Sequence, residues 1–252
     1  MTRHLIRLIS AASLVLATLP AVTRAQMQIP QRFENLQVLP KDIPRDTLIQ
    51  IMRAFSMGLG VRCTFCHVAV REDTTERLVF KSDDKAEKRD ARVMIKMTRE
   101  INASFLPQLP QRHDPPVRVQ CVTCHRGSAT PRTLDVVLEE TIAKFGVDSA
   151  VARYRRLREE TLPLGRYNFG EMTLSELARR LGEEGKTAEA IAMLELNQEF
   201  YPKSSAIDFQ LGQLYERRGE RDQAVARYRA ALTKEPENRM ARRRLMELGV
   251  NP

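Results

Sequence analysis

The chain has 252 residues, a formal net charge of +9, 42% hydrophobic residues and 29% charged residues. This length allows one or two domains with a buried core, and the composition excludes wholesale disorder and a collagen-like chain. No uninterrupted apolar stretch of roughly 18 residues occurs beyond residue 25, which excludes a polytopic membrane protein. The four cysteines form two identical pairs, and most of the functional argument depends on them.

Residues 1–25 are typical of a secretory signal peptide. Arg3 and Arg7 precede a mostly apolar run over residues 8–22, and small residues end at Ala25. An uncleaved anchor is the competing interpretation, although the run is shorter than the ~20 residues of a membrane span. We therefore expect an exported, periplasmic protein, either free or membrane-associated. Cleavage would remove three arginines, so the net charge would fall to +6, which does not indicate a nucleic-acid partner.

The cysteines lie in two copies of one motif, Cys63-Thr64-Phe65-Cys66-His67 and Cys121-Val122-Thr123-Cys124-His125. Disulfides, a zinc site, redox dithiols and c-type haem attachment are the four interpretations to compare. Zinc does not need a histidine directly after each pair, and a redox dithiol is expected beside a βαβ pattern that the sequence lacks. Two thiols three residues apart can meet the two vinyl groups of a porphyrin, and the next residue places an imidazole under the iron.

The motifs therefore predict two covalently bound c-type haems. Cys63, Cys66, Cys121 and Cys124 would form the thioethers, and His67 and His125 would be the proximal ligands. Six-coordinate irons need two further ligands. Because His4 belongs to the predicted signal peptide, His113 is the only other histidine, and it is more typical of a solvated loop. Methionine must therefore be considered as a sixth ligand.

A short helix is predicted over residues 46–57, with Asp46 as its N-cap and Gly58 as its stop. Its apolar face includes Met52. Because the helix ends a few residues before Cys63, a turn there would bring Met52 over the first haem.

A second helix is predicted over residues 84–105, ended by prolines, in the same position relative to the second motif. Met94 and Met97 lie on its apolar face at helical spacing. Methionines at this spacing also occur as ordinary core residues, so the spacing alone leaves both interpretations open.

Residues 35–131 resemble the photosynthetic reaction-centre cytochrome c subunit family. The resemblance includes both haem motifs and the helix in front of each, notably Leu48-Ile-Gln-Ile-Met-Arg-Ala and Ala91-Arg-Val-Met-Ile-Lys-Met-Thr-Arg-Glu-Ile-Asn. It implies that Met94 is the sixth ligand of the second haem and Met52 that of the first, with Met97 as a fallback.

The chain also departs from that family. Members hold four haems in two paired halves, and this chain contains one half. The family uses a histidine beyond the second helix to ligate a haem of the other half, whereas Gln108-Leu109 stands in that region here. The departure fits a chain without the second half. It leaves open whether the two haems serve a reaction centre or another donor and acceptor.

The C-terminal half repeats with a period of 34 residues, the length of a tetratricopeptide repeat. Gly185, Ala190 and Pro202 recur as Gly219, Ala224 and Pro236. We expect helix pairs over residues 133–160, 171–204 and 205–238, followed by a capping helix over 239–249. Such repeats provide a concave surface for a protein partner, or they act as a purely structural cap.

These observations together predict an all-α protein. A signal peptide (1–25) would precede a dihaem cytochrome c domain (26–132) and tetratricopeptide-like helical repeats (133–252). The predicted function is periplasmic single-electron transfer rather than enzymatic catalysis. A peroxidase-like haem enzyme with one open haem, or a repeat scaffold that recruits a redox partner, are the alternatives. Expected partners are redox proteins, including a membrane reaction centre or a respiratory complex.

Overall fold

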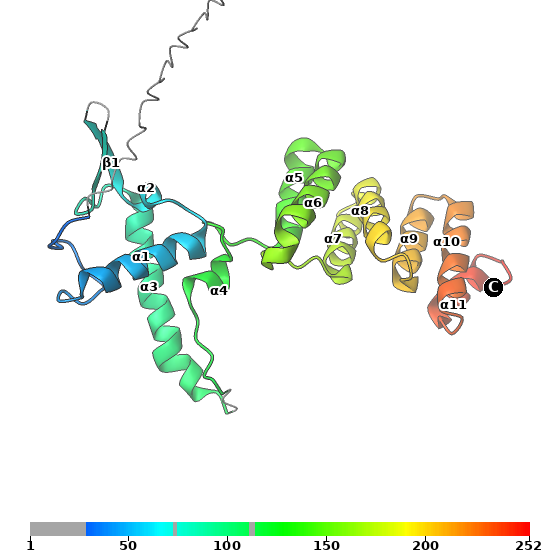
Figure 1. Cartoon of the computed structure of the whole chain (residues 1–252). Helices are drawn as coiled ribbons and strands as arrows, with labels where there is room; N and C mark the ends of the chain where they lie inside the picture. The colour runs from blue at the N-terminus through cyan, green and yellow to red at the C-terminus, as the bar shows by residue number, and fades with distance from the viewer. Residues whose placement is uncertain (1–28, 73–74, 111–113) are drawn as a thin grey trace, which may run out of the picture. The chain divides into compact units, whose positions relative to one another are not determined.

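The computed structural model describes residues 29–72, 75–110 and 114–252 (Figure 1). It confirms the all-α fold class, with helical repeats in the C-terminal half. The predicted signal peptide, residues 1–25, and His113 lie outside the described residues. Within the described ranges, none of the helices combines the length and the apolar character that crossing a membrane requires.

The chain forms two compact units. Of the described residues, the first contains those up to Arg45 together with Cys63–Lys96, and the second contains Asp46–Arg62 together with Met97–Pro252. The division is therefore discontinuous in sequence. The predicted boundary between a cytochrome domain ending at residue 132 and a repeat domain beginning at residue 133 stays a prediction.

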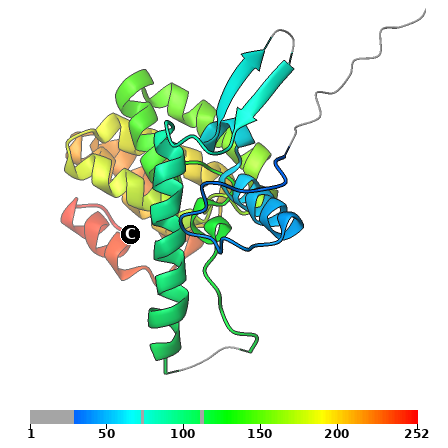
Figure 2. The same ribbon diagram turned by 90° about the vertical axis from the view of Figure 1, so that its left-hand side faces the viewer.

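The first unit contains a short antiparallel hairpin that the sequence did not predict. Strand β1 (Val68–Glu72) pairs with β2 (Thr75–Val79), with Val68 opposite Val79 (Figure 2). The hairpin directly follows the one-turn helix α2 (Cys63–Cys66), and helix α3 (Ala86–Glu100) begins after it. Because the two strands are antiparallel and adjacent in sequence, they form no βαβ unit of the kind that a redox dithiol would accompany.

Asp83 connects three segments of the first unit. Its carboxylate accepts hydrogen bonds from Asn35 (2.9 Å), Gln37 (3.0 Å) and Arg92 (2.7 Å), and Lys88 lies 3.1 Å from it. The hydrogen bond from Arg92 is the main reason why the pKa of Asp83 lies well below its usual range. Lys88 is buried and also donates to two backbone carbonyls just before Asp83, so its ammonium group is fully satisfied.

In the second unit, helix α1 (Arg45–Leu59) covers the predicted first helix, but the predicted stop at Gly58 is wrong. Gly58 lies inside the helix and is buried. A Cβ there would come within 3.1 Å of the backbone nitrogen of Val122 and 3.4 Å of the Cβ of Cys121. The glycine therefore allows a close approach to the second motif. The helix ends one residue later, where Gly60 adopts a left-handed φ of +66°.

The predicted second helix changes type before its end. The α-helix α3 stops at Glu100, a π-helical turn follows over Ile101–Phe105, and a 3₁₀ turn follows over Leu106–Gln108. The backbone therefore stays helical beyond residue 105, with Pro107 inside the last turn, where its missing N–H is tolerated.

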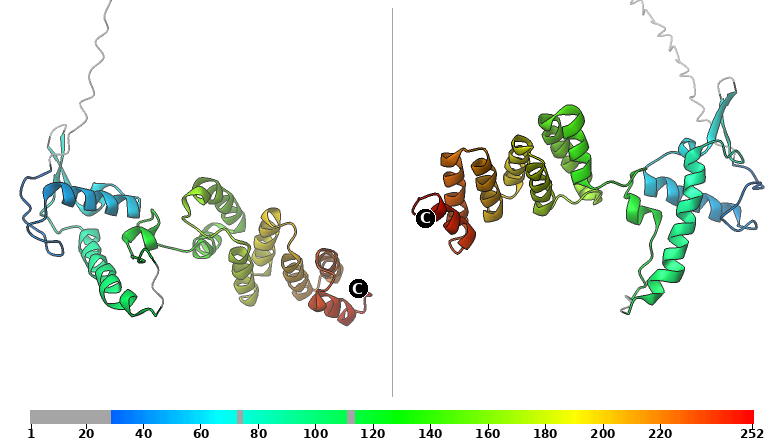
Figure 3. Two further views of the ribbon diagram at one scale, coloured as in Figure 1. Left: turned by 60° about the horizontal axis from the view of Figure 1, so that its bottom comes forward. Right: turned by 180° about the vertical axis from the view of Figure 1, so that it is seen from behind.

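The repeat region, residues 133–252, consists of three helix pairs and one final helix, arranged in sequence order (Figure 3). Their bounds are α5 (Leu134–Phe145), α6 (Val147–Thr161), α7 (Glu171–Glu183), α8 (Thr187–Phe200), α9 (Ser205–Arg217), α10 (Arg221–Lys234) and α11 (Arg239–Glu247). These helices fall at the predicted repeat positions. The 34-residue period includes the helix ends, since Gly185 (φ +80°) and Gly219 (φ +76°) both adopt the left-handed conformation that follows a helix.

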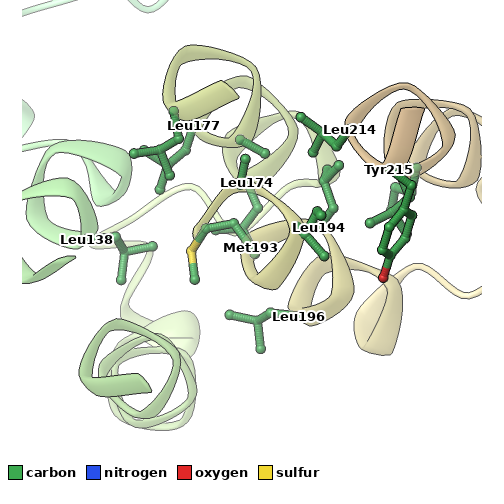
Figure 4. Close-up of a cluster of buried hydrophobic side chains, with 14 of the residues drawn as sticks. Leu138, Leu174, Leu177, Met193, Leu194, Leu196, Leu214 and Tyr215 are labelled. Carbon is green, nitrogen blue, oxygen red and sulfur yellow. The ribbon is translucent and has the colours of Figure 1, made fainter. Parts of the chain in front are cut away.

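One hydrophobic core extends through the repeat region from α5 to α11. Figure 4 shows its central part, where Leu138 of α5, Leu174 of α7 and Met193 of α8 are fully buried. Small residues permit the close packing of each pair. A Cβ on Gly212 of α9 would lie only 2.5 Å from the ring of Tyr228 on α10. Each helix pair thus buries its apolar face against its neighbour, as stacked repeats require.

Candidate haem-binding site

The first motif folds as a single helical turn. Helix α2 spans Cys63–Cys66, and the amide of His67 donates to the carbonyl of Cys63 at 3.0 Å. Residues three apart on such a turn share one face, so both thiols lie on the same side. All four cysteines of the chain are free thiols, which disagrees with the disulfide interpretation. Within the described ranges, no three His, Cys, Asp or Glu side chains gather in a way that could hold a metal ion.

His67 is held as a neutral imidazole. Its ring packs edge-on against Phe80 with the centroids 4.9 Å apart. Desolvation by burial, assisted by the nearby charges of Lys88 and Arg92, lowers the pKa of His67 to about 4. Its Nδ1 is buried without a hydrogen-bond partner in the described structure. A neutral imidazole retains the lone pair that a metal ion needs, so the protonation state of His67 suits a proximal ligand.

Two residues that support the first motif were not foreseen from the sequence. Lys85 donates from Nζ to the carbonyl of Thr64, inside the motif turn, and Phe80 supplies the ring against His67. Burial raises the pKa of the Cys66 thiol, which keeps it protonated near neutral pH. Lys85 follows Thr64 by 21 residues. No local sequence pattern connects the two, so only the fold reveals the contact.

The second motif also forms one helical turn, α4 (Cys121–His125). Gln120 and Thr123 form a capping box at its start, in which the amide of Gln120 donates to the Thr123 hydroxyl at 3.0 Å. At the other end, Arg126 adopts a left-handed φ of +48°, which is uncommon for a residue with a Cβ. The two thiols and the imidazole therefore have the same local arrangement as in the first motif, but the chain leaves this turn differently.

His125 differs from His67 in having a defined hydrogen bond. Its Nδ1 lies 2.9 Å from the carbonyl oxygen of Ser128. A carbonyl only accepts hydrogen bonds, so Nδ1 carries a proton, and Nε2 is the ring nitrogen left for a metal ion. An outer hydrogen bond of this kind fixes the tautomer and the ring orientation of a histidine that ligates a metal. The geometry of His125 therefore fits a proximal haem ligand.

Asn102 positions the segment of chain that leads into the second motif. It lies in the π-helical turn after α3, and its side chain both donates to the carbonyl of Val119 (2.8 Å) and accepts from the Val119 amide (2.8 Å). Val119 precedes Cys121 by two residues. No local pattern in the sequence indicates this role, although Asn102 ends one of the stretches that carry the family resemblance. π-helical turns are frequent at functional sites, and this one turns an amide side chain toward the motif.

The predicted sixth ligands lie on helices, as expected. Met52 is partly exposed on α1, and Met94 and Met97 are 43% and 44% exposed on α3. Met52 belongs to the second unit and the first motif to the first unit, whereas Met94 belongs to the first unit and the second motif to the second. The assignments of Met52 and Met94, with Met97 as the fallback, stay predictions.

The burial pattern also fits a bound apolar group. We call residues 29–132 the haem region. Among its described residues, the buried hydrophobic side chains are Leu48 and Leu78, while several large apolar side chains are exposed. The exposed ones on or near the predicted ligand helices include Met57, Val93, Met94, Met97, Phe105 and Val122. A folded segment of this length normally buries many more, so a porphyrin is well suited to complete this core. The site residues and the unburied apolar surface both fit haem.

A cleft of about 430 Å³ lies next to the second motif. Cys124 and His125 line it on one side, and Arg126, Arg132 and Arg166 contribute guanidinium groups. Arg132 is paired with a glutamate on α5. The lining also contains the carboxylate of Asp135, but the three guanidinium groups outnumber it, and this balance favours a group that carries carboxylates.

Comparisons with known proteins agree with this description. The family model described as "Photosynthetic reaction centre cytochrome C subunit" matches residues 2–155, more than half of the chain, and a tetratricopeptide-repeat model matches residues 205–248. The chain is also similar to cytochrome c-554 of Chloroflexus aurantiacus, with 32% identity over 94 residues. That alignment covers 37% of this chain and 20% of the relative, so the chain spans about a fifth of the length of this relative.

Proposed function

This chain belongs to the photosynthetic reaction-centre cytochrome C subunit family, and from that premise we propose that it is a periplasmic dihaem electron carrier. Family membership makes it a c-type cytochrome with covalently bound haem, followed by tetratricopeptide-like repeats. The number of haems, the periplasmic location and the nature of the partners are the proposed parts.

The observation that carries the proposal is the shared geometry of the two motifs. Each Cys-x-x-Cys-His sequence forms one helical turn with both thiols free and on one face. Each turn ends on an imidazole whose environment leaves a lone pair for iron: burial keeps His67 neutral, and Ser128 holds the proton of His125 on Nδ1. Two complete sets of ligands therefore support two haems.

Haem supplies an iron that gains and loses one electron. The residues of the chain hold it and control access to it. Cys63, Cys66, Cys121 and Cys124 would anchor the two groups, and His67 and His125 would be the proximal ligands. Met52 and Met94 are the proposed distal ligands, and His/Met ligation raises a reduction potential. A sixth side chain closes the iron to substrate, which favours electron transfer over peroxidase chemistry.

Export supports the same function. Residues 1–25 have the composition of a signal peptide, and c-type haem attachment in bacteria takes place outside the cytoplasm. Proposed partners are redox proteins that meet the chain there, among them a membrane reaction centre or a respiratory complex. The repeat region would provide the protein-binding surface for such a partner.

Haem counting on matched variants tests the stoichiometry. We expect the purified protein to contain two haems per chain, by intact mass and by the absorbance of the pyridine haemochrome. Cys63→Ala/Cys66→Ala and Cys121→Ala/Cys124→Ala should each retain one haem. A chain with fewer than two haems, or a pair of variants in which one motif makes no difference to the count, would contradict the dihaem proposal.

The oxidised spectrum tests the distal ligands. Met94→Ala should remove part of the Met-to-iron charge-transfer feature, and Met97→Ala, on the same helix face, should leave it intact. Met52→Ala should remove the remaining part. The reduced wild-type protein should bind carbon monoxide slowly or not at all. Rapid binding by the wild-type protein would instead favour the enzyme with one open haem.

A further inference from the structure

The turn after the second motif is an unusual piece of backbone. Arg126 and Gly127 both have positive φ angles, +48° and +76°. For Arg126 this conformation is unfavourable, so surrounding contacts must hold it. One such contact comes from the end of α1, where the carbonyl of Gly58 accepts from the amide of Gly127 at 2.9 Å. A Cβ on Gly60 would overlap the carbonyl oxygen of Gly127, so the two backbones are packed together.

This turn sets the orientation of His125. The amide of Ser128 donates to the carbonyl of His125 at 2.8 Å, and the carbonyl of Ser128 accepts from His125 Nδ1 at 2.9 Å. Both hydrogen bonds join His125 to Ser128, so Arg126 and Gly127 lie between the bonded residues. Any change in the backbone angles of Arg126 or Gly127 therefore moves the carbonyl that holds the imidazole.

Arg166, which follows Arg126 by 40 residues, also holds this turn. Its Nε donates to the carbonyl of Arg126 at 3.2 Å. Its guanidinium also lies against Gly127: a Cβ on Gly127 would meet Nη2 of Arg166 at 3.1 Å. A planar guanidinium can hydrogen-bond a carbonyl and cover a glycine at the same time, whereas the ammonium group of a lysine cannot.

Arg166 belongs to the repeat region, and its segment is anchored there. It lies on the connector between α6 and α7, three residues before Phe169, which is buried in the repeat core. The ring of Phe169 packs edge-on against Tyr154 of α6, with centroids 5.5 Å apart, and its carbonyl accepts from the hydroxyl of Tyr201 at 2.7 Å. Arg166 is therefore a fixed side chain that reaches from the repeat core to the second motif.

We propose that Arg166 is a positioning residue for the second haem, through which the repeat region fixes the turn that orients His125. The proposal rests on the proposed function, in which His125 is a haem ligand. It adds a role for the repeats that is separate from partner binding: they set the properties of one of the two haems. The chain after the first motif differs, because β1 follows His67 directly.

The test compares three variants of the full-length haem-loaded protein. Arg166→Gln removes the charge and the guanidinium, and Arg166→Lys retains the charge alone. Arg132→Gln is the matched control, because Arg132 lines the same cleft but is paired with Glu140 and, within the described structure, does not hydrogen-bond the turn. The readouts are haem content, the midpoint potentials of the two reduction waves, and the paramagnetically shifted proton resonances of the two axial histidines.

Two haems per chain should be present in every variant. Arg166→Gln should lower the midpoint potential of one wave, since loss of a cation favours the ferric state, and should shift the resonances of His125 only. Arg166→Lys should have a midpoint potential close to that of the wild type, but its His125 resonances should remain shifted. Arg132→Gln should leave the resonances unchanged.

Three results would overturn the proposal. The first is an Arg166→Gln variant in which the resonances of His125 are unchanged. The second is an Arg166→Lys variant with the resonances of the wild type, and the third is an Arg132→Gln variant whose resonances shift as they do in Arg166→Gln. A wild-type chain without a haem at the second motif would instead contradict the proposed function, and the haem count detects that case separately. If Arg166→Gln does not fold, Gly127→Ala probes the contact from the other side. Its added Cβ should shift the same resonances in the wild type, and a smaller shift is expected in an Arg166→Lys background.

Discussion

The haem region and the repeat region stabilise themselves in different ways. The repeat region contains a continuous apolar core from Leu134 to Leu245, whereas the described part of the haem region buries only Leu48 and Leu78 among its hydrophobic side chains. The haem region relies instead on hydrogen-bonded polar side chains such as Asp83, and on glycines that permit close backbone contact. The comparison indicates that one region folds on its own residues and the other needs its prosthetic groups to complete a core.

The largest expected effect follows from preventing haem attachment. In the full-length variant Cys63→Ala/Cys66→Ala/Cys121→Ala/Cys124→Ala, we expect α1, α3 and α4 to lose most of their protection from amide hydrogen exchange. The helices α7–α10 should keep theirs, because their core contains no haem. Exchange measured peptide by peptide checks this. Equal protection of the haem region with and without haem would show that the contrast in burial has no energetic meaning.

A matched pair of apolar truncations measures the same contrast. Leu138→Ala removes a fully buried side chain from α5 and should lower the free energy of unfolding of the repeat region by about 2–5 kcal/mol. Val93→Ala removes a side chain that is 62% exposed on α3, and should change stability by less than about 0.5 kcal/mol in the haem-free protein. Thermal and denaturant unfolding provide both values. Similar costs for the two variants would contradict the comparison.

Close packing within the repeats can be tested at a glycine. Gly212→Ala should destabilise the repeat region by about 1–3 kcal/mol, because the new Cβ meets the fully buried ring of Tyr228. Gly185→Ala is the control: nothing lies within 4 Å of its Cβ, so only the left-handed φ adds a cost of about 1 kcal/mol. A Tyr228→Leu change should relieve the first variant but not the second. Denaturant unfolding of the wild type, the three single variants and the two double variants measures this relief, and equal costs of Gly212→Ala with and without Tyr228→Leu would contradict it.

The smallest effect concerns the hydrogen-bonded polar side chains of the haem region. The pKa of Asp83 is depressed in the folded state, so its contribution to stability is present above the unfolded pKa of about 3.9 and is lost as the pH falls below that value. Asp83→Asn should therefore cost about 1 kcal/mol at neutral pH and progressively less in acid. Asp90→Asn, on the exposed face of α3, serves as the control. The free energy of unfolding of both variants is measured from about pH 7 down to about pH 3, a range that crosses the unfolded pKa. A difference between the two variants that stays constant over this range would contradict the prediction.

Local patterns in the sequence predicted the local parts of the structure. The 34-residue period placed the helix pairs from α5 to α10, since each buries an apolar face at regular spacing. The two Cys-x-x-Cys-His motifs were recognisable because thiols three residues apart share a helical face. Fold class and family resemblance were both confirmed on these grounds.

Features that depend on distant partners could not be predicted. Gly58 looked like a helix stop, but it is a contact point for Val122, 64 residues later. The hairpin after His67 was missed because β1 and β2 are short and carry charged residues among their apolar ones. Arg166 gave no signal at all, since an arginine on a connector is usually a solvated surface residue and its target lies 40 residues earlier.

Gly127 has a consequence for how such chains should be compared. It has a positive φ, lies against the backbone of Gly60, and is covered by Arg166. A library of all substitutions at residue 127 should therefore favour glycine strongly, while Ala69, which occupies the same position after His67, should tolerate several residues. The two haem signatures are thus of unequal length: five residues define the first, whereas the second extends to a seventh position, at which glycine is favoured. Relatives with a similar link to a repeat region should be recognisable by that extra glycine.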